Sequence, residues 1–187
     1  SPRSASTCAP RPKSRSASLE WCDIIANDSR IAGTSRRSNE VFIRDLPVSD
    51  ADVVGEVGRG FYTLIDGITP ERIVISAEAC GIGFRALERA IAYAKERVVF
   101  DRPIGQNQAI AHPLADSYSE LVAAELLWQK AAWTYDRGEP AGPLANMAKV
   151  RCADASFRAC DRALQTLGGF GYAREYHVER YWREARL

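Results

Sequence analysis

The sequence predicts a mainly α-helical fold, an antiparallel bundle of four helices preceded by a short β-strand. From Ile73 to Val98, apolar or small residues recur at alternating steps of four and three residues. The same spacing returns in two further long stretches, 107–138 and 143–169. Such spacing places one apolar stripe on each helix. Because short connections join these stretches, we expect successive helices to run antiparallel.

Residues 1–38 differ from the rest of the chain in composition. They hold nine of the 14 serines, and seven basic side chains against three acidic ones. This stretch has little apolar periodicity, so we expect it to be disordered or non-native. An Arg- and Ser-rich, acid-poor composition is typical of an organelle transit peptide, but the chain begins with Ser. A cut or mistranslated fragment is an equal alternative, and we assign the stretch no function.

The first structured element expected is a short strand over 39–48, "NEVFIRDLPV". Apolar and polar residues alternate there through Val41 and Ile43, and Pro47 ends the run. The glycines of "GEVGRGF" then predict a loop that leads into a helix.

The stretch "GIGFRA" raises a choice between a cofactor loop and a helix. Gly81, Gly83 and Ala86 fit G-x-G-x-x-A, a pattern that can cradle the phosphates of NAD or FAD between a strand and a helix. The 4-3 apolar spacing, however, runs straight through the pattern without a break, and "AEAC" before it consists of helix formers. We therefore expect both glycines inside a helix. The residues of this stripe are Ile73, Ala77, Cys80, Phe84, Leu87, Ile91, Ala94 and Val98.

Two long helices and a short one follow. The second long helix is predicted to end at Gly138, and the third at Gly168-Gly169, where glycine is a natural C-terminal signal. "HVERYWREARL" at 177–187 predicts a last, charged amphipathic helix.

Composition excludes several functional classes. The formal net charge is +1 and no basic stretch is interleaved with aromatic residues, which argues against nucleic-acid binding. No apolar run approaches the roughly 20 residues that a membrane span needs. The two histidines stand apart from any cluster of ligands, so we expect no metal. Five cysteines, an odd number without a CxxC, favour a reducing compartment over a disulfide framework or secretion.

Three segments carry candidate functional residues, each with an ordinary structural alternative. In "TPERIV", Thr69 and Pro70 suit the start of a helix, and Glu71 either complements the helix dipole or serves as a base. The corner that holds Arg97, Phe100 and Gln108 is either a phosphate site or a polar turn. "QTLGGFGY", from Gln165 to Tyr172, holds more glycines than a helix end needs. It is either a close approach to a ligand or a mobile loop.

Together these segments resemble the acyl-CoA dehydrogenase family. "PERIVISAEACGIGFRALERAIAYAKERVVFDRPIGQNQAIAHPLADSYSEL" and "QTLGGFGYAREYHVERYWREARL" carry the resemblance, which covers about residues 39–187. It implies that 39–55 are the end of the middle β-domain, including its last strand. Residues 56–187 would be the C-terminal helical bundle domain, truncated at its end.

The resemblance also implies site residues and a cofactor. FAD would lie extended between bundle and β-domain, with its ADP half against a neighbouring subunit. Arg97 would contact the pyrophosphate, and Phe100 and Gln108 would line the same cleft. The ADP portion would be held across the dimer interface by Gln165, Gly168 and Gly169.

The activity implied is α,β-dehydrogenation of an acyl-CoA thioester. Glu71 matches the base of the isovaleryl- and long-chain-type members, and Arg72 would lie near the CoA moiety. In many other members the base lies beyond the last helix instead. Partners would be the acyl-CoA substrate, an electron-transfer flavoprotein and further subunits in a homodimer or homotetramer. The compartment would be the bacterial cytoplasm or the mitochondrial matrix.

The sequence departs from the family pattern at Asp101, where glycine is usual and where a carboxylate would repel a pyrophosphate. The alternatives to a dehydrogenase are an acyl-CoA oxidase or flavin monooxygenase on the same scaffold, and a non-catalytic helical assembly module.

Overall fold

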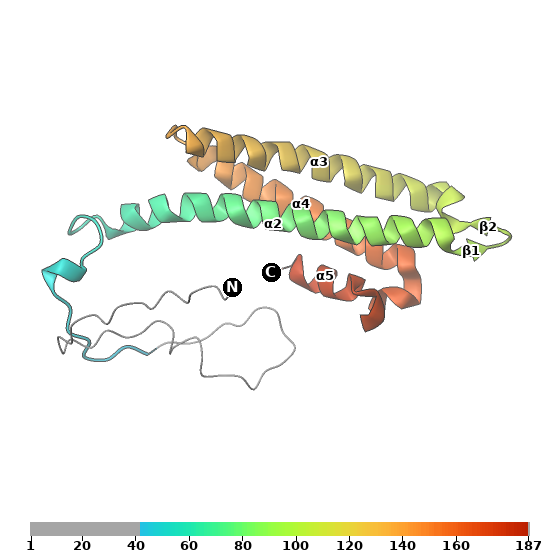
Figure 1. The fold of residues 1–187 in the computed structure, drawn as a ribbon, viewed down its shortest axis with the longest axis horizontal. Helices are drawn as coiled ribbons and strands as arrows, with labels where there is room; N and C mark the ends of the chain where they lie inside the picture. The colour runs from blue at the N-terminus through green and yellow to red at the C-terminus, as the bar shows by residue number, and fades with distance from the viewer. Residues whose placement is uncertain (1–41, 187) are drawn as a thin grey trace, which may run out of the picture. The chain divides into compact units, whose positions relative to one another are not determined.

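A computed structural model describes residues 42–186 of the chain, and it is mainly helical from Gly60 onward (Figure 1). This confirms the predicted fold class. The described part holds four α-helices: α2 (Gly60–Glu96), α3 (Gln108–Asp136), α4 (Gly142–Leu167) and α5 (Val178–Glu184). Two short strands, β1 (Val98–Val99) and β2 (Arg102–Pro103), pair antiparallel between α2 and α3. Four 3₁₀ turns complete it: Asp50–Asp52, Ile104–Gln106, Gly168–Tyr172 and Arg174–Tyr176.

The three long helices lie side by side, and α3 runs opposite to α2 and α4 (Figure 1). Helix α4 packs along both of its neighbours, and α5 folds back against α2 and α4. The predicted stripe faces this core within α2, because Cys80, Leu87 and Ala94 are all buried. Its last member, Val98, is an exception: α2 ends at Glu96, and Val98 lies in β1 and is exposed. Most of the remaining buried positions are alanines and cysteines, which let the helix axes approach closely.

One close approach between helices involves the glycine pattern discussed above. Gly81 and Gly83 both lie inside α2, as the helical spacing predicted, so they form no phosphate loop. A Cβ atom on Gly83 would lie 3.0 Å from the Cα of Ser156 on α4. Glycine at 83 therefore serves helix packing. A Cβ on Gly81 would meet nothing within 4 Å.

The strand predicted for 39–48 is wrong for the described residues. Residues 42–48 form no regular structure, and Phe42, Ile43 and Val48 are exposed. A strand needs a neighbour to pair its backbone groups, and no strand stands beside this stretch among the described residues. The remaining residues of the prediction, 39–41, and the whole of 1–38 lie outside the described part. The boundaries proposed at 38 and 55 stay predictions.

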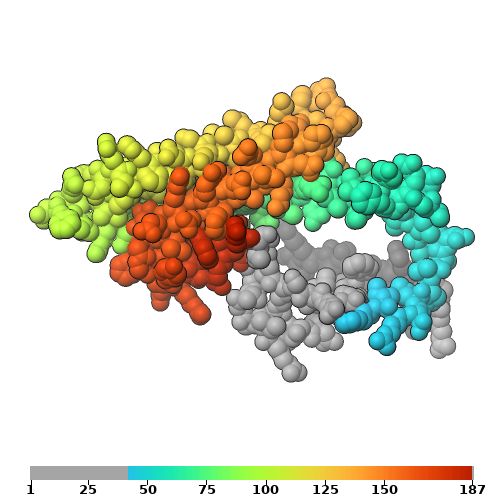
Figure 2. Space-filling view, turned by 180° about the vertical axis from the view of Figure 1, so that it is seen from behind, coloured from blue at the N-terminus to red at the C-terminus, as the bar shows by residue number. Residues whose placement is uncertain are grey.

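The loop predicted over 55–61 does lead into a helix, whereas the second possible start, at Thr69, is wrong. Helix α2 begins nine residues earlier, at Gly60, and Pro70 lies in its interior. The Thr69 hydroxyl donates back to the Ile65 carbonyl at 3.3 Å instead of capping. Pro70 has no N–H for the carbonyl four residues before it, a loss that water can offset here. No residue of α2 before Ile73 is buried, and Figure 2 shows these first turns standing clear of α3 and α4.

Candidate active site and cofactor-binding end

Helix α2 carries the predicted base and the predicted pyrophosphate ligand at well-separated positions. Glu71 and Arg97 are 26 residues apart, and a rise of about 1.5 Å per residue separates them by about 39 Å. That distance exceeds the diameter of a small domain. The structure therefore does not bring Glu71 together with Arg97 in one chain.

Arg97 ends α2 and begins the small hairpin. Its backbone N–H donates to the Tyr93 carbonyl at 2.8 Å, and its own carbonyl accepts from the Ile104 N–H at 2.9 Å. These two bonds fix the backbone at the corner. The guanidinium group is exposed, and it has no hydrogen-bond or ion-pair partner within residues 42–186. A cation held in place by its backbone and left unpaired is available to a bound anion.

Phe100 and Asp101 form the tip of the hairpin between β1 and β2. Their φ angles are +53° and +62°, so both adopt the left-handed conformation that a type I′ turn requires at its two central positions. This explains why glycine suits position 101 on grounds of backbone geometry alone. The Phe100 ring is 94% exposed, so it is free to cover a ligand that lies against the corner.

The corner is held by Arg102 and Asn107, of which sequence reasoning did not single out Asn107. Arg102 Nη2 donates to Asn107 Oδ1 at 2.7 Å, and Asn107 Nδ2 donates to the Ile104 carbonyl at 3.1 Å. The Arg102 guanidinium group is therefore engaged in a hydrogen bond within the loop. Gln108 begins α3 beside this pair, and its exposed amide has no partner among the described side chains.

The glycine-rich segment after α4 uses its three glycines differently. Gly168 ends α4 with a φ of +59°, and a Cβ on Gly171 would lie 2.5 Å from the Leu164 carbonyl oxygen. The fold itself therefore favours glycine at 168 and 171. At Gly169, by contrast, a Cβ would meet nothing within 4 Å and φ is not positive. Gln165, one turn earlier on α4, is exposed.

An aromatic cluster joins this segment to α2. The rings of Phe170 and Tyr176 stack with centroids 5.1 Å apart, and Tyr93 meets Phe170 edge-on at 6.4 Å. Because Tyr93 precedes Arg97 by one helical turn, the segment lies at the same end of the bundle as the hairpin (Figure 1). The structure thus gathers the predicted cofactor ligands of both segments at one end.

The surroundings of Glu71 are sparse. Its carboxylate is exposed and has no partner in the described part of the chain. Arg72 beside it is half-buried, and its carbonyl accepts a 2.6 Å bond from the Ser76 hydroxyl. Consecutive residues project about 100° apart on a helix, so the two side chains leave α2 in different directions.

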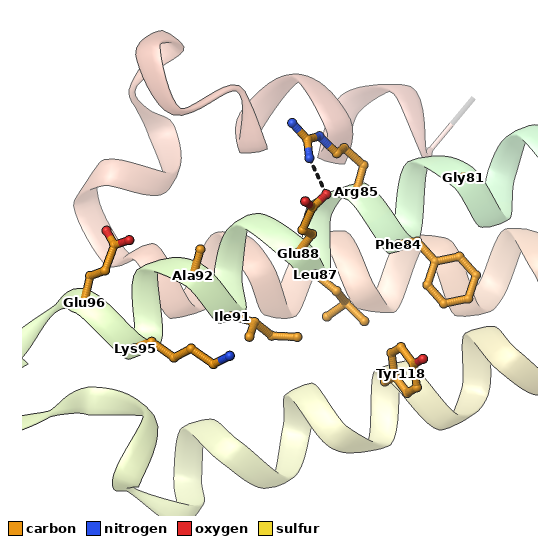
Figure 3. Close-up of a pocket in the computed structure, with 10 residues that line it drawn as sticks. All are labelled: Gly81, Phe84, Arg85, Leu87, Glu88, Ile91, Ala92, Lys95, Glu96 and Tyr118. Atoms are coloured by element: carbon orange, nitrogen blue, oxygen red, sulfur yellow. Dashed lines mark hydrogen bonds and ion pairs between the residues drawn. The ribbon is translucent and has the colours of Figure 1, made fainter.

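A cleft on the bundle lies elsewhere. It measures about 770 Å³ and is lined by α2 and by Tyr118 of α3, as Figure 3 shows. Its walls include Phe84 and Ile91, but none of the predicted site residues. Within residues 42–186 there is no cluster of three or more side chains suited to a metal ion. No helix described by the structure is long and apolar enough to cross a membrane.

A family model described as "Acyl-CoA dehydrogenase, C-terminal domain" matches residues 58–187.

The chain belongs to the acyl-CoA dehydrogenase family.

Individual relatives agree with this assignment. Acyl-CoA dehydrogenase FadE12 of Mycobacterium tuberculosis is 43% identical over 153 residues, which are 81% of this chain and 39% of the relative. The structure of butyryl-CoA dehydrogenase from Megasphaera elsdenii matches with a TM-score of 0.75 and 36% identity, over 76% of this chain and 37% of that one. A structure described as "PigA with FAD and proline" matches with a TM-score of 0.74 and 26% identity, over 76% and 37%.

The chain spans about two fifths of the length of these relatives. At the level of the family, the comparisons confirm the predicted enzyme class, an oxidoreductase, and the predicted cofactor, FAD. The roles of the eight named residues stay predictions, since similarity over the domain does not test individual side chains. Of the residues that shape this end, sequence reasoning missed Asn107 and Tyr93. No motif marks either one, because their roles come from contacts with Arg102 and Phe170.

Proposed function

We propose that this chain forms the C-terminal domain of an enzyme that dehydrogenates acyl-CoA thioesters between the α and β carbons. The observation that carries the proposal is the end of the bundle where Arg97 lies. There an unpaired, backbone-anchored guanidinium group lies at the same end as Gly169, a glycine that the fold itself does not require.

These residues fit the phosphate-bearing part of FAD. Arg97 presents a planar set of N–H donors, which suits a pyrophosphate oxygen pair. Gly169 leaves its backbone uncovered, so a flat or anionic group can approach it closely. Phe100 and Gln108 offer an exposed ring and an exposed amide beside Arg97. Gln165 and Gly168 complete the surface from the α4 side.

The separation along α2 indicates how two chains would cooperate. A carboxylate about 39 Å from Arg97 serves a different cofactor molecule from the one that Arg97 holds. We therefore propose that Arg97 and the segment from Gln165 to Gly169 bind the FAD that serves a neighbouring subunit. A homodimer is the smallest assembly that satisfies this arrangement, and a homotetramer satisfies it as well.

Glu71 would act as the base. Its carboxylate takes a proton from the α carbon, and a base must come within hydrogen-bond reach of that proton. When bound, FAD supplies the acceptor for the β-hydride. Arg72, about 100° around the helix from Glu71, would place a positive charge near the phosphates of the CoA moiety. An electron-transfer flavoprotein would receive the electrons, in the cytoplasm or the mitochondrial matrix.

The first test is flavin retention. The chain is mixed with FAD, desalted, and its visible spectrum and mass in solution are recorded. We expect a yellow dimer or larger assembly, and Arg97→Ala is expected to lose flavin while keeping its helical circular dichroism. A yellow Arg97→Ala variant would contradict the role given to Arg97.

The second test addresses the base, in a chimera where residues 58–187 replace the matching part of mycobacterial FadE12. Glu71→Gln is expected to abolish acyl-CoA oxidation by an artificial electron acceptor while flavin stays bound. Turnover near that of the parent chimera would show that a residue other than Glu71 is the base. Rapid reoxidation of the reduced flavin by air would identify an oxidase instead.

A further inference from the structure

Phe170 is the outer ring of an aromatic stack at the end of the bundle where Arg97 lies. Its ring stacks on the Tyr176 ring, with centroids 5.1 Å apart and planes inclined by 28°. The Tyr176 ring packs against the hydrophobic core, whereas 45% of Phe170 is exposed. From the core outward, Tyr176 therefore comes first and Phe170 second.

Tyr93 lies beside this stack and does not cover it. The centre of its ring is 6.4 Å from the centre of each stacked ring, at interplanar angles of 72° to Phe170 and 90° to Tyr176. A ring on the outer face of Phe170 would lie much farther from Tyr176 than from Phe170. Equal distances instead place Tyr93 against the edges of both rings. Neither of these two aromatic neighbours therefore covers the outer face of Phe170.

The backbone around Phe170 holds the exposed ring in place. The Phe170 carbonyl accepts a hydrogen bond from the Ala173 N–H at 3.1 Å. The next residue, Gly171, leaves no room for a side chain, because a Cβ there would lie 2.5 Å from the Leu164 carbonyl oxygen. A ring that is already fixed loses little conformational freedom when a ligand binds to it, so less of the binding energy is lost.

The groups near Phe170 suit a nucleotide. Gly169 precedes it in the chain and leaves its backbone uncovered. Tyr93, which meets the Phe170 ring edge-on, precedes Arg97 by one turn of α2, an advance of about 5.4 Å along the helix axis. A flat apolar face and an unpaired guanidinium group thus occur at the same end of the bundle. A nucleotide combines a flat base with phosphate groups, which only a ribose separates.

We propose that the outer face of Phe170 stacks against the adenine ring of FAD. This inference rests on the proposed function, in which the segment from Gln165 to Gly169 holds the cofactor, and Phe170 is the next residue. Every base has a π-face, and an aromatic side chain stabilises the bound base by stacking on that face. Phe170 thereby favours FAD over FMN, because FMN carries a phosphate but no adenine.

The test compares the affinities of ADP and inorganic pyrophosphate for the purified 187-residue chain, by calorimetric titration at constant ionic strength. Both probes carry a diphosphate, but only ADP carries adenine. Phe170→Leu is expected to weaken ADP binding by about fivefold or more, as the loss of one stacking contact implies. Pyrophosphate binding is expected to change less than about twofold. Phe170→Tyr keeps the flat ring, so ADP affinity is expected to stay within about twofold of the parent.

Tyr172→Leu is the matched control. Tyr172 belongs to the same 3₁₀ turn as Phe170 and is exposed, but its ring contacts no other ring in the described part of the chain. Its replacement is expected to change ADP affinity less than about twofold. FMN is the third probe, and Phe170→Leu is expected to leave its binding unchanged. Circular dichroism checks that each variant is helical.

Three results would overturn this inference and leave the proposed function standing. The first is unchanged ADP affinity in Phe170→Leu. The second is equal weakening of ADP and pyrophosphate, which would mean that the substitution disturbs the whole turn. The third is weaker binding of FMN but not of ADP, which would mean that Phe170 stacks on the isoalloxazine ring.

A different result would contradict the proposed function itself. If the parent chain gives no saturable heat with ADP or with pyrophosphate, the end of the bundle near Arg97 binds no diphosphate, and the role of Phe170 is overturned with it. If Phe170→Leu fails to fold, Phe170→Met replaces it. Methionine fills irregular space but has no flat face, so ADP binding is still expected to weaken.

Discussion

Gly83 of α2 lies directly against Ser156 of α4, so closely that a methyl group at 83 would come 3.0 Å from the Ser156 Cα. The same methyl group would lie 2.7 Å from Leu121 Cδ2 on α3. The absence of a side chain at 83 therefore makes room for both α3 and α4 beside α2.

Gly83→Ala is expected to lower the free energy of unfolding by about 1–3 kcal/mol, because a backbone atom cannot move aside as a side chain can. Gly81→Ala, two residues earlier in the same helix, is the control. Nothing lies within 4 Å of its Cβ position, so alanine is expected to raise the stability by about 0.5–1 kcal/mol. Urea unfolding measures both, and equal effects would contradict the packing argument.

Substitutions of Asp101 can distinguish the effect of backbone strain on stability from the effect of charge on flavin binding. Asp101→Asn keeps a residue that tolerates a positive φ, so stability is expected to stay within about 0.5 kcal/mol. Removing the carboxylate beside the proposed pyrophosphate site is expected to increase the fraction of flavin retained after desalting. Asp101→Val, with a β-branched side chain, is expected to cost about 1–2 kcal/mol of stability. Unchanged flavin retention in Asp101→Asn would show that the charge at 101 is irrelevant to the cofactor.

The glycines after α4 give a second contrast. Gly169→Ala is expected to leave the unfolding free energy within about 0.5 kcal/mol but to reduce flavin retention, since only the proposed ligand needs this glycine. Gly171→Ala is expected to cost about 1–3 kcal/mol, because its Cβ would collide with the Leu164 carbonyl. Full flavin retention in a well-folded Gly169→Ala variant would remove Gly169 from the proposed site.

Because the Cys160 thiol is buried, we expect the free energy of unfolding to fall at alkaline pH. Burial raises the pKa of this thiol from 9.0 to about 12. The unfolded chain releases the proton near pH 9, whereas the folded chain keeps it. Stability therefore falls between pH 9 and 12, by at most about 1.4 kcal/mol per pH unit for this one group. Urea unfolding at several pH values should show a shallower decline in Cys160→Ala. An identical slope would rule out this thiol as a source.

The long helices were predictable because their apolar stripe repeats over many turns. Thr69-Pro70-Glu71 misled the sequence reasoning, because it carries the local signals of a helix start inside a helix that begins at Gly60, at the end of the loop predicted over 55–61. The hairpin was missed for the opposite reason. Phe100 and Asp101 form a type I′ turn, whose usual sequence is Asn-Gly or another pair that contains glycine.

The candidate site divides in the same way. Glu71, Arg97 and Gln165 were predicted from short motifs, whereas the contact between Tyr93 and Phe170, which joins two segments far apart in the sequence, has no motif.

Glu71 lies at the boundary between an exposed part and a packed part of α2. On its C-terminal side α2 is supported by neighbours from Ile73 onward, and on its N-terminal side no residue of α2 is buried. Amide hydrogens before this border should therefore exchange with solvent much faster than those after it. The carboxylate sits on the last unsupported turn, so a segment that docks against the exposed turns would stiffen them and fix the direction of the carboxylate in the same event.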